Sequence, residues 1–193
     1  MNDYIILALC WSLFYAVHSA MAASKLKRIL KGKLGQRMKW YRLFYSLLSI
    51  LLLMGIGLVS LKIPTQKILS ESQFLLYFGY LFATFGTIIM VKSSKGWSLK
   101  SFLGIKPTDK NKSLFQSGWY ARVRHPLYLG LAMIFLGYFL VSGTGAALTH
   151  FVCLVLYLPI GIYFEEQNLV DQFGHDYLKY QKKVPTFFPK LKK

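Results

Sequence analysis

The sequence predicts an all-α, polytopic integral membrane protein with five transmembrane helices. First, 54% of its 193 residues are hydrophobic and only 16% are charged, with a mean hydropathy of +0.39. An average soluble domain has about 25% charged residues. Second, five apolar stretches approach the roughly 20 residues that a helix needs to cross a bilayer. Third, the chain has 24 Lys and Arg residues against 7 acidic residues, and 22 of the 24 basic residues lie in every second segment that connects the apolar stretches. Two cysteines are too few for a disulfide framework or a four-cysteine zinc site.

The expected spans follow the apolar stretches in chain order. They cover residues 4–23, 43–61, 74–91, 126–142 and 146–164. The fourth is the shortest, so we expect it to cross at an angle or to begin in the interface. The fifth contains Pro159, which removes one backbone hydrogen bond and is expected to kink the helix. We expect one integral membrane domain over 1–193, with three spans and a basic loop in 1–91 and a binding loop, helical hairpin and tail in 92–193.

The basic residues predict the orientation. Eight lie between the first two spans, eight between the third and fourth, and six after the fifth, whereas only Lys62 and Lys67 lie elsewhere. Cytoplasmic loops are enriched in Lys and Arg. The N-terminus is therefore expected outside and the C-terminus in the cytoplasm. Membrane lipids are the expected partners of these basic segments, and nucleic acid is not expected because the segments adjoin membrane spans.

The last two spans are separated only by residues 143–145, which predicts a tight antiparallel hairpin. Residues 122–128 and 164–167 should therefore meet at one end of it. Four of the seven acidic residues lie just beyond the fifth span. Glu165 and Glu166 either end a helix and pair with Arg122 or Arg124, or contribute to a ligand site. A ligand with a carboxylate, an amine, a ribose and a base suits this mixture of groups, as in S-adenosylmethionine or, less well, a nicotinamide dinucleotide.

The tail beyond the hairpin alternates aromatic and basic residues. It contains Phe173-Gly174, then Tyr177, Tyr180 and Val184-Pro185. One interpretation is a short amphipathic segment on the membrane surface. The other is a lid that folds over the end of the hairpin. Both interpretations remain open at the level of sequence.

These motifs, taken together and in order, resemble the isoprenylcysteine carboxyl methyltransferase family and its bacterial relatives, which include phospholipid and thiol methyltransferases. The resemblance covers about residues 110–190 and rests on four motifs: Ser117-Gly118-Trp119-Tyr120, Arg124-His125-Pro126-Leu127-Tyr128-Leu129-Gly130, Glu165-Glu166, and Phe173-Gly174 with the tyrosines that follow it. It implies S-adenosylmethionine as cofactor, bound on the cytoplasmic side. It also implies a lipophilic or small methyl acceptor and a bacterial inner membrane location.

The resemblance also implies which residues contact the cofactor. Glu165 is the best match to the family's glutamate, and Glu166 is the alternative. The arginine that the eukaryotic enzymes carry four residues earlier is replaced here by Gly161, which argues against a prenylcysteine substrate. The remaining expected contacts are Lys112, Ser113, Leu114, Phe115, Tyr120, His125, Pro126, Leu127 and Tyr128.

The reaction implied is direct methyl transfer to a thiol, amine or carboxylate, for which alignment of donor and acceptor is the main requirement. His125 or Glu166 is a candidate base for a neutral nucleophile. Arg124 either orients an anionic substrate, contacts a lipid phosphate or pairs with Glu166. Two other classes share parts of the pattern: NADPH-dependent sterol reductases and membrane proteins that keep the fold without activity. The double glutamate favours a methyl donor over NADPH.

Overall fold

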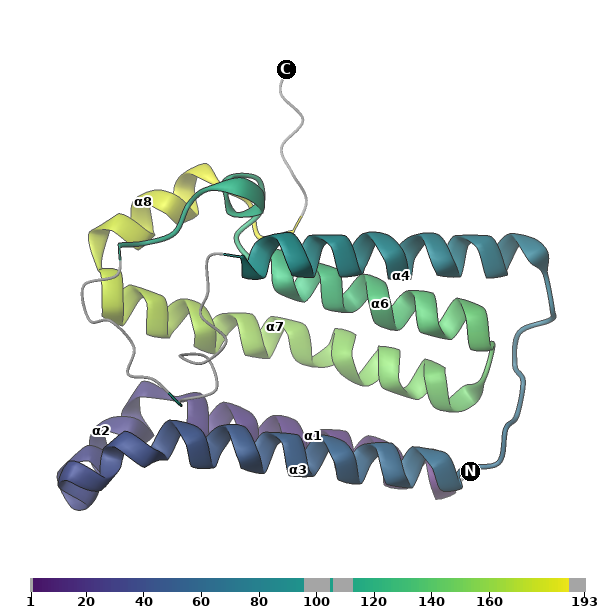
Figure 1. The fold of residues 1–193 in the computed structure, drawn as a ribbon, viewed down its shortest axis with the longest axis horizontal. Helices are drawn as coiled ribbons and strands as arrows, with labels where there is room; N and C mark the ends of the chain where they lie inside the picture. The colour runs from purple at the N-terminus through teal and green to yellow at the C-terminus, as the bar shows by residue number, and fades with distance from the viewer. Residues whose placement is uncertain (1, 96–104, 106–112, 188–193) are drawn as a thin grey trace. The chain divides into compact units, whose positions relative to one another are not determined.

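The structure is a computed structural model that describes residues 2–95, 105 and 113–187. Within that part of the chain, the regular elements are helices, accompanied by one isolated β-bridge. The predicted all-α fold is therefore confirmed. Contacts divide the described chain into two compact units, one containing residues 2–64 and the other residues 65–95 and 113–187. Figure 1 shows the helices of both units, and each unit is described by itself.

The first unit is a pair of long helices joined by a short basic connection. Helix α1 (Asn2–Ala22) and helix α3 (Tyr41–Lys62) lie side by side and antiparallel (Figure 1). Helix α2 (Ser24–Leu34) and the 3₁₀ helix η1 (Gly35–Trp40) connect them. The Tyr41 hydroxyl donates to the Met21 carbonyl at 2.8 Å, which attaches the start of α3 to the end of α1.

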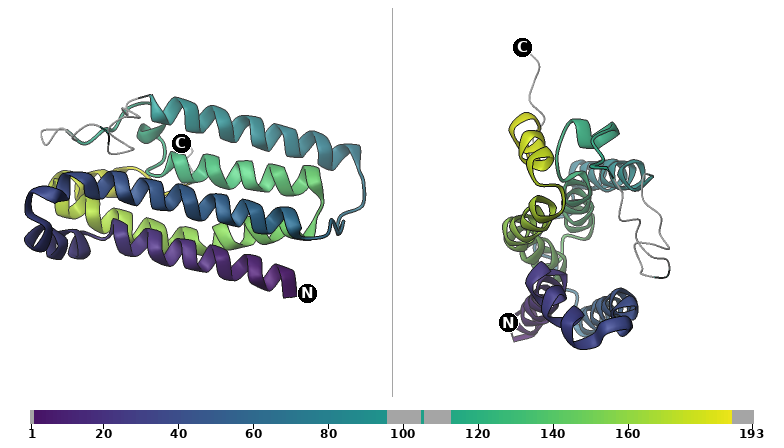
Figure 2. Two further views of the ribbon diagram at one scale, coloured as in Figure 1. Left: turned by 60° about the horizontal axis from the view of Figure 1, so that its bottom comes forward. Right: turned by 90° about the vertical axis from the view of Figure 1, so that its left-hand side faces the viewer.

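The second unit contains the hairpin and everything that packs on it. Its helices are α4 (Gln73–Ser94), η2 (Gly118–Ala121), α6 (Pro126–Ser142), α7 (Gly145–Phe173) and α8 (His175–Lys183). Figure 2 shows α4 and α6 running side by side along most of their length. The third expected span therefore packs against the hairpin helix α6.

Glycines allow α4 and α6 to approach closely. A Cβ atom built on Gly86 would lie 2.5 Å from the Gly130 carbonyl oxygen, and one on Gly137 would lie 2.5 Å from the Gly79 carbonyl oxygen. The two glycines of each helix are seven residues apart, so they recur on one face after two turns. Small residues at such positions let helix backbones come into contact within a membrane.

The hairpin of α6 and α7 forms as the sequence predicts. Pro126 occupies the first turn of α6, where its missing N–H costs nothing. Gly143 ends α6 in the left-handed conformation (φ 63°), and the Thr144 side chain caps α7 by accepting from Ala147 N. The preceding loop closes over this turn, since Ile68 N donates to Gly143 O at 2.7 Å.

The lengths of the apolar helices agree with four of the five expected spans. Helices α1, α3, α4 and α7 are long and apolar enough to cross a membrane, whereas α6 has 17 residues and is shorter. Crossing by α6 remains a prediction. Helix α7 continues to Phe173, nine residues past the expected end of its span, so its last turns extend beyond the apolar stretch.

Candidate functional site at the open end of the hairpin

The open end of the hairpin brings together the two ionisable segments that the sequence analysis singled out. His125 directly precedes α6, and Glu165 and Glu166 lie on α7. His125 Nε2 is 3.0 Å from Glu166 Oε1, and His125 Nδ1 is 3.5 Å from Glu165 Oε2. The expected meeting of residues 122–128 with residues 164–167 is thus confirmed. The imidazole is buried, with 2% of its side-chain surface exposed.

His125 is positioned to carry a positive charge. Burial alone lowers the pKa of this imidazole, but hydrogen bonds and charge from Glu165 and Glu166 outweigh the effect of burial and raise it. Each ring nitrogen faces one carboxylate, which is the arrangement that a doubly protonated imidazolium favours. His125 therefore holds the two glutamates at the start of α6.

Glu166 is saturated by protein donors. Its Oε1 atom accepts from Arg124 Nε at 2.8 Å and from the Tyr177 hydroxyl at 3.3 Å, in addition to its contact with His125. Its Oε2 atom accepts from Gln181 Nε2 at 2.9 Å. The pairing of Arg124 with Glu166, one of the three roles expected for Arg124, is the one that the structure shows.

Arg124 also attaches the C-terminal segment to the hairpin. Its Nη1 donates to the backbone carbonyls of Gln181 (3.1 Å) and Val184 (2.7 Å), and its Nη2 donates to Thr186 Oγ1 at 3.0 Å. Its backbone N–H donates to the Pro185 carbonyl at 2.8 Å. The segment after α8 therefore runs beside the start of α6.

The end of this segment reaches the apolar core of the hairpin. Phe187 packs against a buried cluster on α7 formed by Leu154, Leu158 and Ile162. Tyr128 of α6 packs against the same cluster. The tail thus has both polar and apolar attachments to the hairpin.

Glu165 differs from its neighbour in exposure and in contacts. Its side chain is 39% exposed, whereas that of Glu166 is 17% exposed. The contact with His125 Nδ1 accounts for one oxygen of Glu165. This carboxylate therefore keeps hydrogen-bonding capacity on a surface that a ligand can reach.

An aromatic ring stacks on His125, and a second aromatic side chain, Tyr120, lies within electrostatic range of Glu165. The Tyr128 ring stacks on His125 with centroids 5.7 Å apart, and the Phe115 ring meets Tyr120 edge-on at 5.6 Å. Burial, and then the negative charge of Glu165, raise the pKa of Tyr120, so its hydroxyl stays protonated. The Tyr180 hydroxyl donates to the Tyr120 carbonyl at 2.6 Å, which fixes η2 against α8.

The other predicted site residues have different surroundings. Pro126 is buried and Leu127 half-buried in the first turn of α6, next to His125. Ser113 is exposed and Leu114 half-buried in the segment before η2, and among the described interactions the Ser113 hydroxyl forms no hydrogen bond with Glu165 or His125. Lys112 lies outside the described residues. The structure therefore links His125 to Tyr128, Glu165 and Glu166, and it links Tyr120 to Phe115 and Glu165.

A cavity of about 380 Å³ lies at the other end of this unit. It is lined by residues from the loop before α4, from the first turn of α4 and from the end of α6, including Glu71, Leu76 and Val141. None of the predicted site residues lines it. We therefore do not assign it to the cofactor.

Sequence reasoning did not identify the residues that hold Glu166 in place. Gln181 and Tyr177 both bind this carboxylate, and they lie four residues apart in α8. Residues at that spacing share one face of a helix. The spacing from Tyr177 to Tyr180 and Gln181 was therefore the available signal that one face of α8 packs against the site.

Comparison with known proteins identifies a family. A family model described as phospholipid methyltransferase matches residues 74–176, just over half of the chain. The matched region begins at the start of α4 and ends within α8, so it includes His125, Glu165 and Glu166. No solved structure matches the chain significantly.

Similar proteins of assigned function are also methyltransferases. A methanethiol S-methyltransferase of a Pseudomonas species is 31% identical over 95% of this chain and 72% of its own length. Methanethiol S-methyltransferase 2 of Bradyrhizobium diazoefficiens is 29% identical, with the same coverage of both chains. A protein-S-isoprenylcysteine O-methyltransferase of Xenopus laevis is 32% identical over 64% of this chain and 44% of its own.

Proposed function

The chain belongs to the phospholipid methyltransferase family and is a methyltransferase, and we propose that it transfers the methyl group of S-adenosylmethionine to a small or lipophilic thiol within the membrane. The observation that carries the proposal is the half-exposed Glu165, held beside His125, Tyr120 and Tyr128. Glu166 stabilises the site without binding the ligand itself, because protein donors already engage both of its oxygens.

The groups at the site fit the chemistry of the proposed cofactor. When bound, S-adenosylmethionine would supply a methyl group on a cationic sulfur; a thiolate acceptor, its proton lost to solvent, would take the methyl group, and S-adenosylhomocysteine would be the second product. Glu165 offers a carboxylate for a ligand ammonium or ribose hydroxyls. The rings of Tyr120 and Tyr128 offer π faces that attract a cation.

The start of α6 is suited to bind a negatively charged group of the ligand. Pro126 has no N–H, and no side-chain hydrogen bond caps this helix end. The Leu127 N–H therefore keeps its capacity to donate to a ligand carboxylate, assisted by the helix dipole. The carboxylate of the ligand's amino-acid moiety would thus meet the start of α6, and its ammonium group would meet Glu165 on α7.

A thiol acceptor agrees best with the residues present. The methanethiol-methylating relatives match 95% of this chain, more than the isoprenylcysteine-methylating relative matches. His125 and Glu166 contact each other, so neither is well placed to remove a proton from a substrate. Among neutral acceptors a thiol needs least assistance, because the small thiolate fraction present at neutral pH is intrinsically very nucleophilic. Gly161, which replaces the arginine of the eukaryotic isoprenylcysteine enzymes, also argues against a prenylcysteine substrate. It is buried, and a Cβ there would lie 2.9 Å from the Tyr157 ring.

Titration of the purified, detergent-solubilised protein with S-adenosylhomocysteine and with NADPH tests the proposal. We expect heat of binding with S-adenosylhomocysteine and none with NADPH. The Glu165→Ala variant should lose binding at least tenfold, about 1.4 kcal/mol. Asp171→Ala is the matched control, because it removes an exposed carboxylate from the same helix.

Two outcomes would overturn parts of this proposal. Binding of NADPH alone would contradict the assigned cofactor. Equal affinity for S-adenosylhomocysteine in wild type, Glu165→Ala and Asp171→Ala would contradict the assigned site while leaving the methyltransferase family intact.

A further inference from the structure

The cavity at the turn of the hairpin, here called the turn cavity, lies where an apolar helix begins. Its volume of about 380 Å³ is within the range of small-ligand sites, about 300–1,000 Å³. Helix α4 starts at Gln73 and is long and apolar enough to cross a membrane. The turn cavity therefore lies at the level where lipid headgroups meet acyl chains.

The walls of the turn cavity are polar on one side and apolar on the other. Charged and hydroxyl side chains come from the loop before α4, and apolar side chains come from α4 and α6. They include Lys67, Ser70, Glu71, Leu75, Leu76 and Val141. A ligand that fits these walls has a charged part and an apolar part.

Backbone pairing holds the polar wall in place. The N–H groups of Ile68 and Leu69 both donate to the Gly143 carbonyl, at 2.7 and 3.1 Å. The Gly145 N–H donates to the Gln66 carbonyl at 3.1 Å, so the loop and the hairpin turn form a short antiparallel bridge. The side chains of the loop are therefore presented to the cavity from a fixed backbone.

The polar wall carries one charge of each sign. The Lys67 ammonium and the Glu71 carboxylate form an ion pair, and their side chains are 54% and 81% exposed. An ion pair this exposed contributes little to stability, so a ligand separates its members at little cost. A ligand with both charges engages both side chains, whereas a simple anion is repelled by Glu71 and a simple cation by Lys67.

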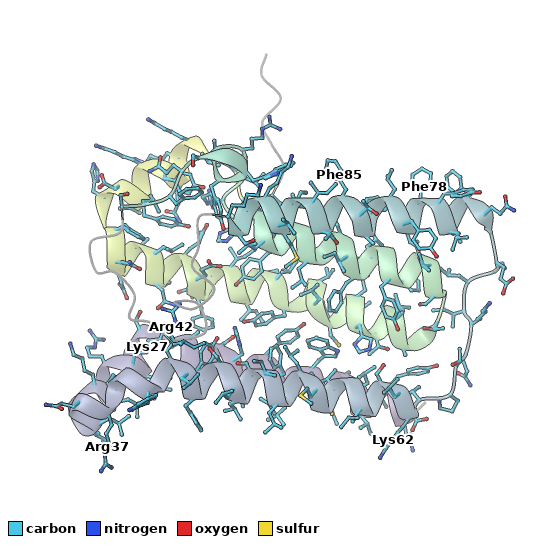
Figure 3. All side chains as sticks on the ribbon, in the orientation of Figure 1. Lys27, Arg37, Arg42, Lys62, Phe78 and Phe85 are labelled. Atoms are coloured by element: carbon cyan, nitrogen blue, oxygen red, sulfur yellow. The ribbon has the colours of Figure 1, made fainter. Side chains whose placement is uncertain are left out.

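The neighbouring face of α4 is suited to acyl chains. Phe74, directly after the cavity residue Gln73, is 65% exposed, and its ring lies 4.3 Å from that of Phe78, centroid to centroid. Figure 3 shows Phe78 and Phe85 on the edge of α4 that faces away from α6, and both are exposed. An apolar surface thus continues from the cavity along a helix that is expected to contact lipid.

We propose that the turn cavity binds the headgroup of a zwitterionic phospholipid, with its phosphate against Lys67, its ammonium against Glu71 and its acyl chains along α4. Both contacts are charge-assisted hydrogen bonds. Twenty residues of α7 separate the turn from Glu165, which corresponds to about 30 Å. A lipid bound here is therefore not the methyl acceptor, and the inference does not depend on the methyl transfer reaction.

Native mass spectrometry of the full chain in detergent tests the site. The protein is titrated with dioleoylphosphatidylethanolamine, with dioleoylphosphatidylglycerol, which lacks the ammonium, or with free phosphoethanolamine, which lacks the acyl chains. We expect one phosphatidylethanolamine to bind, with phosphatidylglycerol about fivefold weaker, the effect of one charge near a headgroup. Free phosphoethanolamine should bind more weakly than either lipid.

Two charge variants test the assigned contacts. Glu71→Gln should weaken phosphatidylethanolamine binding about fivefold without weakening phosphatidylglycerol binding, so the preference between the lipids is lost. Lys67→Gln should weaken both lipids by a similar factor. Ser70→Trp places a large side chain in the cavity and should weaken both lipids at least tenfold, which tests the cavity independently of charge.

Asp3→Asn and Lys62→Gln are the matched controls, because they remove the same charges on the same predicted side of the membrane and neither residue lines the cavity. Each should change lipid binding less than twofold. Equal binding of the two lipids by wild type, or equal losses in Glu71→Gln and Asp3→Asn, would overturn the zwitterion site. Tighter binding of free phosphoethanolamine than of phosphatidylethanolamine would overturn the choice of a lipid.

Discussion

Arg124 connects three parts of the second unit through one side chain. It pairs with Glu166 on α7, donates to two carbonyls at the end of α8, and reaches Thr186 in the segment beyond. Its side chain is only 13% exposed. A guanidinium with its five N–H donors suits such a junction, whereas a lysine ammonium would not match this geometry.

Replacement of Arg124 should therefore destabilise the protein. Arg124→Ala removes the guanidinium that neutralises the charge of the Glu166 carboxylate. It also removes the donors that hold the C-terminal segment. We expect a loss of about 3 kcal/mol, the lower end of the cost of breaking a buried ion pair. Thermal unfolding in detergent, with limited proteolysis of the C-terminal segment, measures both effects. Arg122→Ala is the control, because it removes the same charge from an exposed position. The guanidinium carbon of Arg122 lies 5.6 Å from the centre of the Trp119 ring. Equal destabilisation by the two variants would contradict this account.

His125 makes stability depend on pH in a defined direction. Its pKa in the folded protein is raised above the ordinary value of 6.5. The folded state therefore binds the proton more tightly than the unfolded chain does. Its stabilising contribution is complete below about pH 6.5 and is lost as the pH rises through the raised pKa. Wild type should thus lose stability relative to His125→Gln as the pH rises above about 6.5. Parallel stability curves for the two proteins would contradict this role.

At the site, the sequence predicted which segments meet but not how each glutamate is used. The short turn at residues 143–145 was enough to place His125 beside Glu165 and Glu166. The different roles of the two glutamates depend on Tyr177 and Gln181, which approach from α8. A one-dimensional pattern does not show which face of a separate helix returns to the site.

At the scale of helices, the packing of α4 on α6 depends on the absence of side chains. Gly79 and Gly86 face Gly137 and Gly130, and a Cβ atom on any of the four would lie within 3 Å of the opposite helix. Apolar content predicted both helices, because length and hydropathy are readable from sequence. Their pairing was not predicted, although two glycines seven residues apart in both stretches were the available signal.

Substitution of Gly86 should separate α4 from α6. In Gly86→Ala the new methyl group would lie 2.5 Å from the Gly130 carbonyl oxygen, so the backbone must shift. We expect a loss of about 1–3 kcal/mol, as for other overpacked sites. Gly57→Ala in α3 is the control, because a Cβ there meets open space. Its expected effect is neutral or stabilising by up to about 1 kcal/mol. Chemical unfolding of both variants in mixed micelles provides the comparison, and equal stability would contradict the close packing.

At the scale of the whole molecule, charge distribution predicts the orientation in the membrane. The basic segments before α3 and after α7 should face the cytoplasm, and the loop before α4 should face outward. The predicted binding site, at the start of α6 and the end of α7, then opens toward the cytoplasm, where the methyl donor is made.

Cysteine labelling in intact cells tests this orientation. Ser70→Cys, in the loop before α4, should react with a membrane-impermeant maleimide added outside, because Ser70 is exposed on that loop. Lys33→Cys, in α2, should react only after permeabilisation. Cys10 and Cys153 lie within α1 and α7, and the unsubstituted protein measures their background. The reverse pattern of labelling would contradict the predicted orientation.

Methyl transfer from S-adenosylmethionine bound at Glu165 is tested most directly by one measurement. The wild-type protein in lipid nanodiscs is incubated with radiolabelled S-adenosylmethionine and methanethiol or a longer alkanethiol. Glu165→Gln and Asp171→Asn are assayed in parallel. We predict a labelled thioether from wild type and Asp171→Asn, and at least a tenfold lower rate from Glu165→Gln. A wild-type rate from Glu165→Gln would contradict the assigned site, and absence of labelled product from every thiol, amine and carboxylate acceptor tested would contradict the proposed reaction.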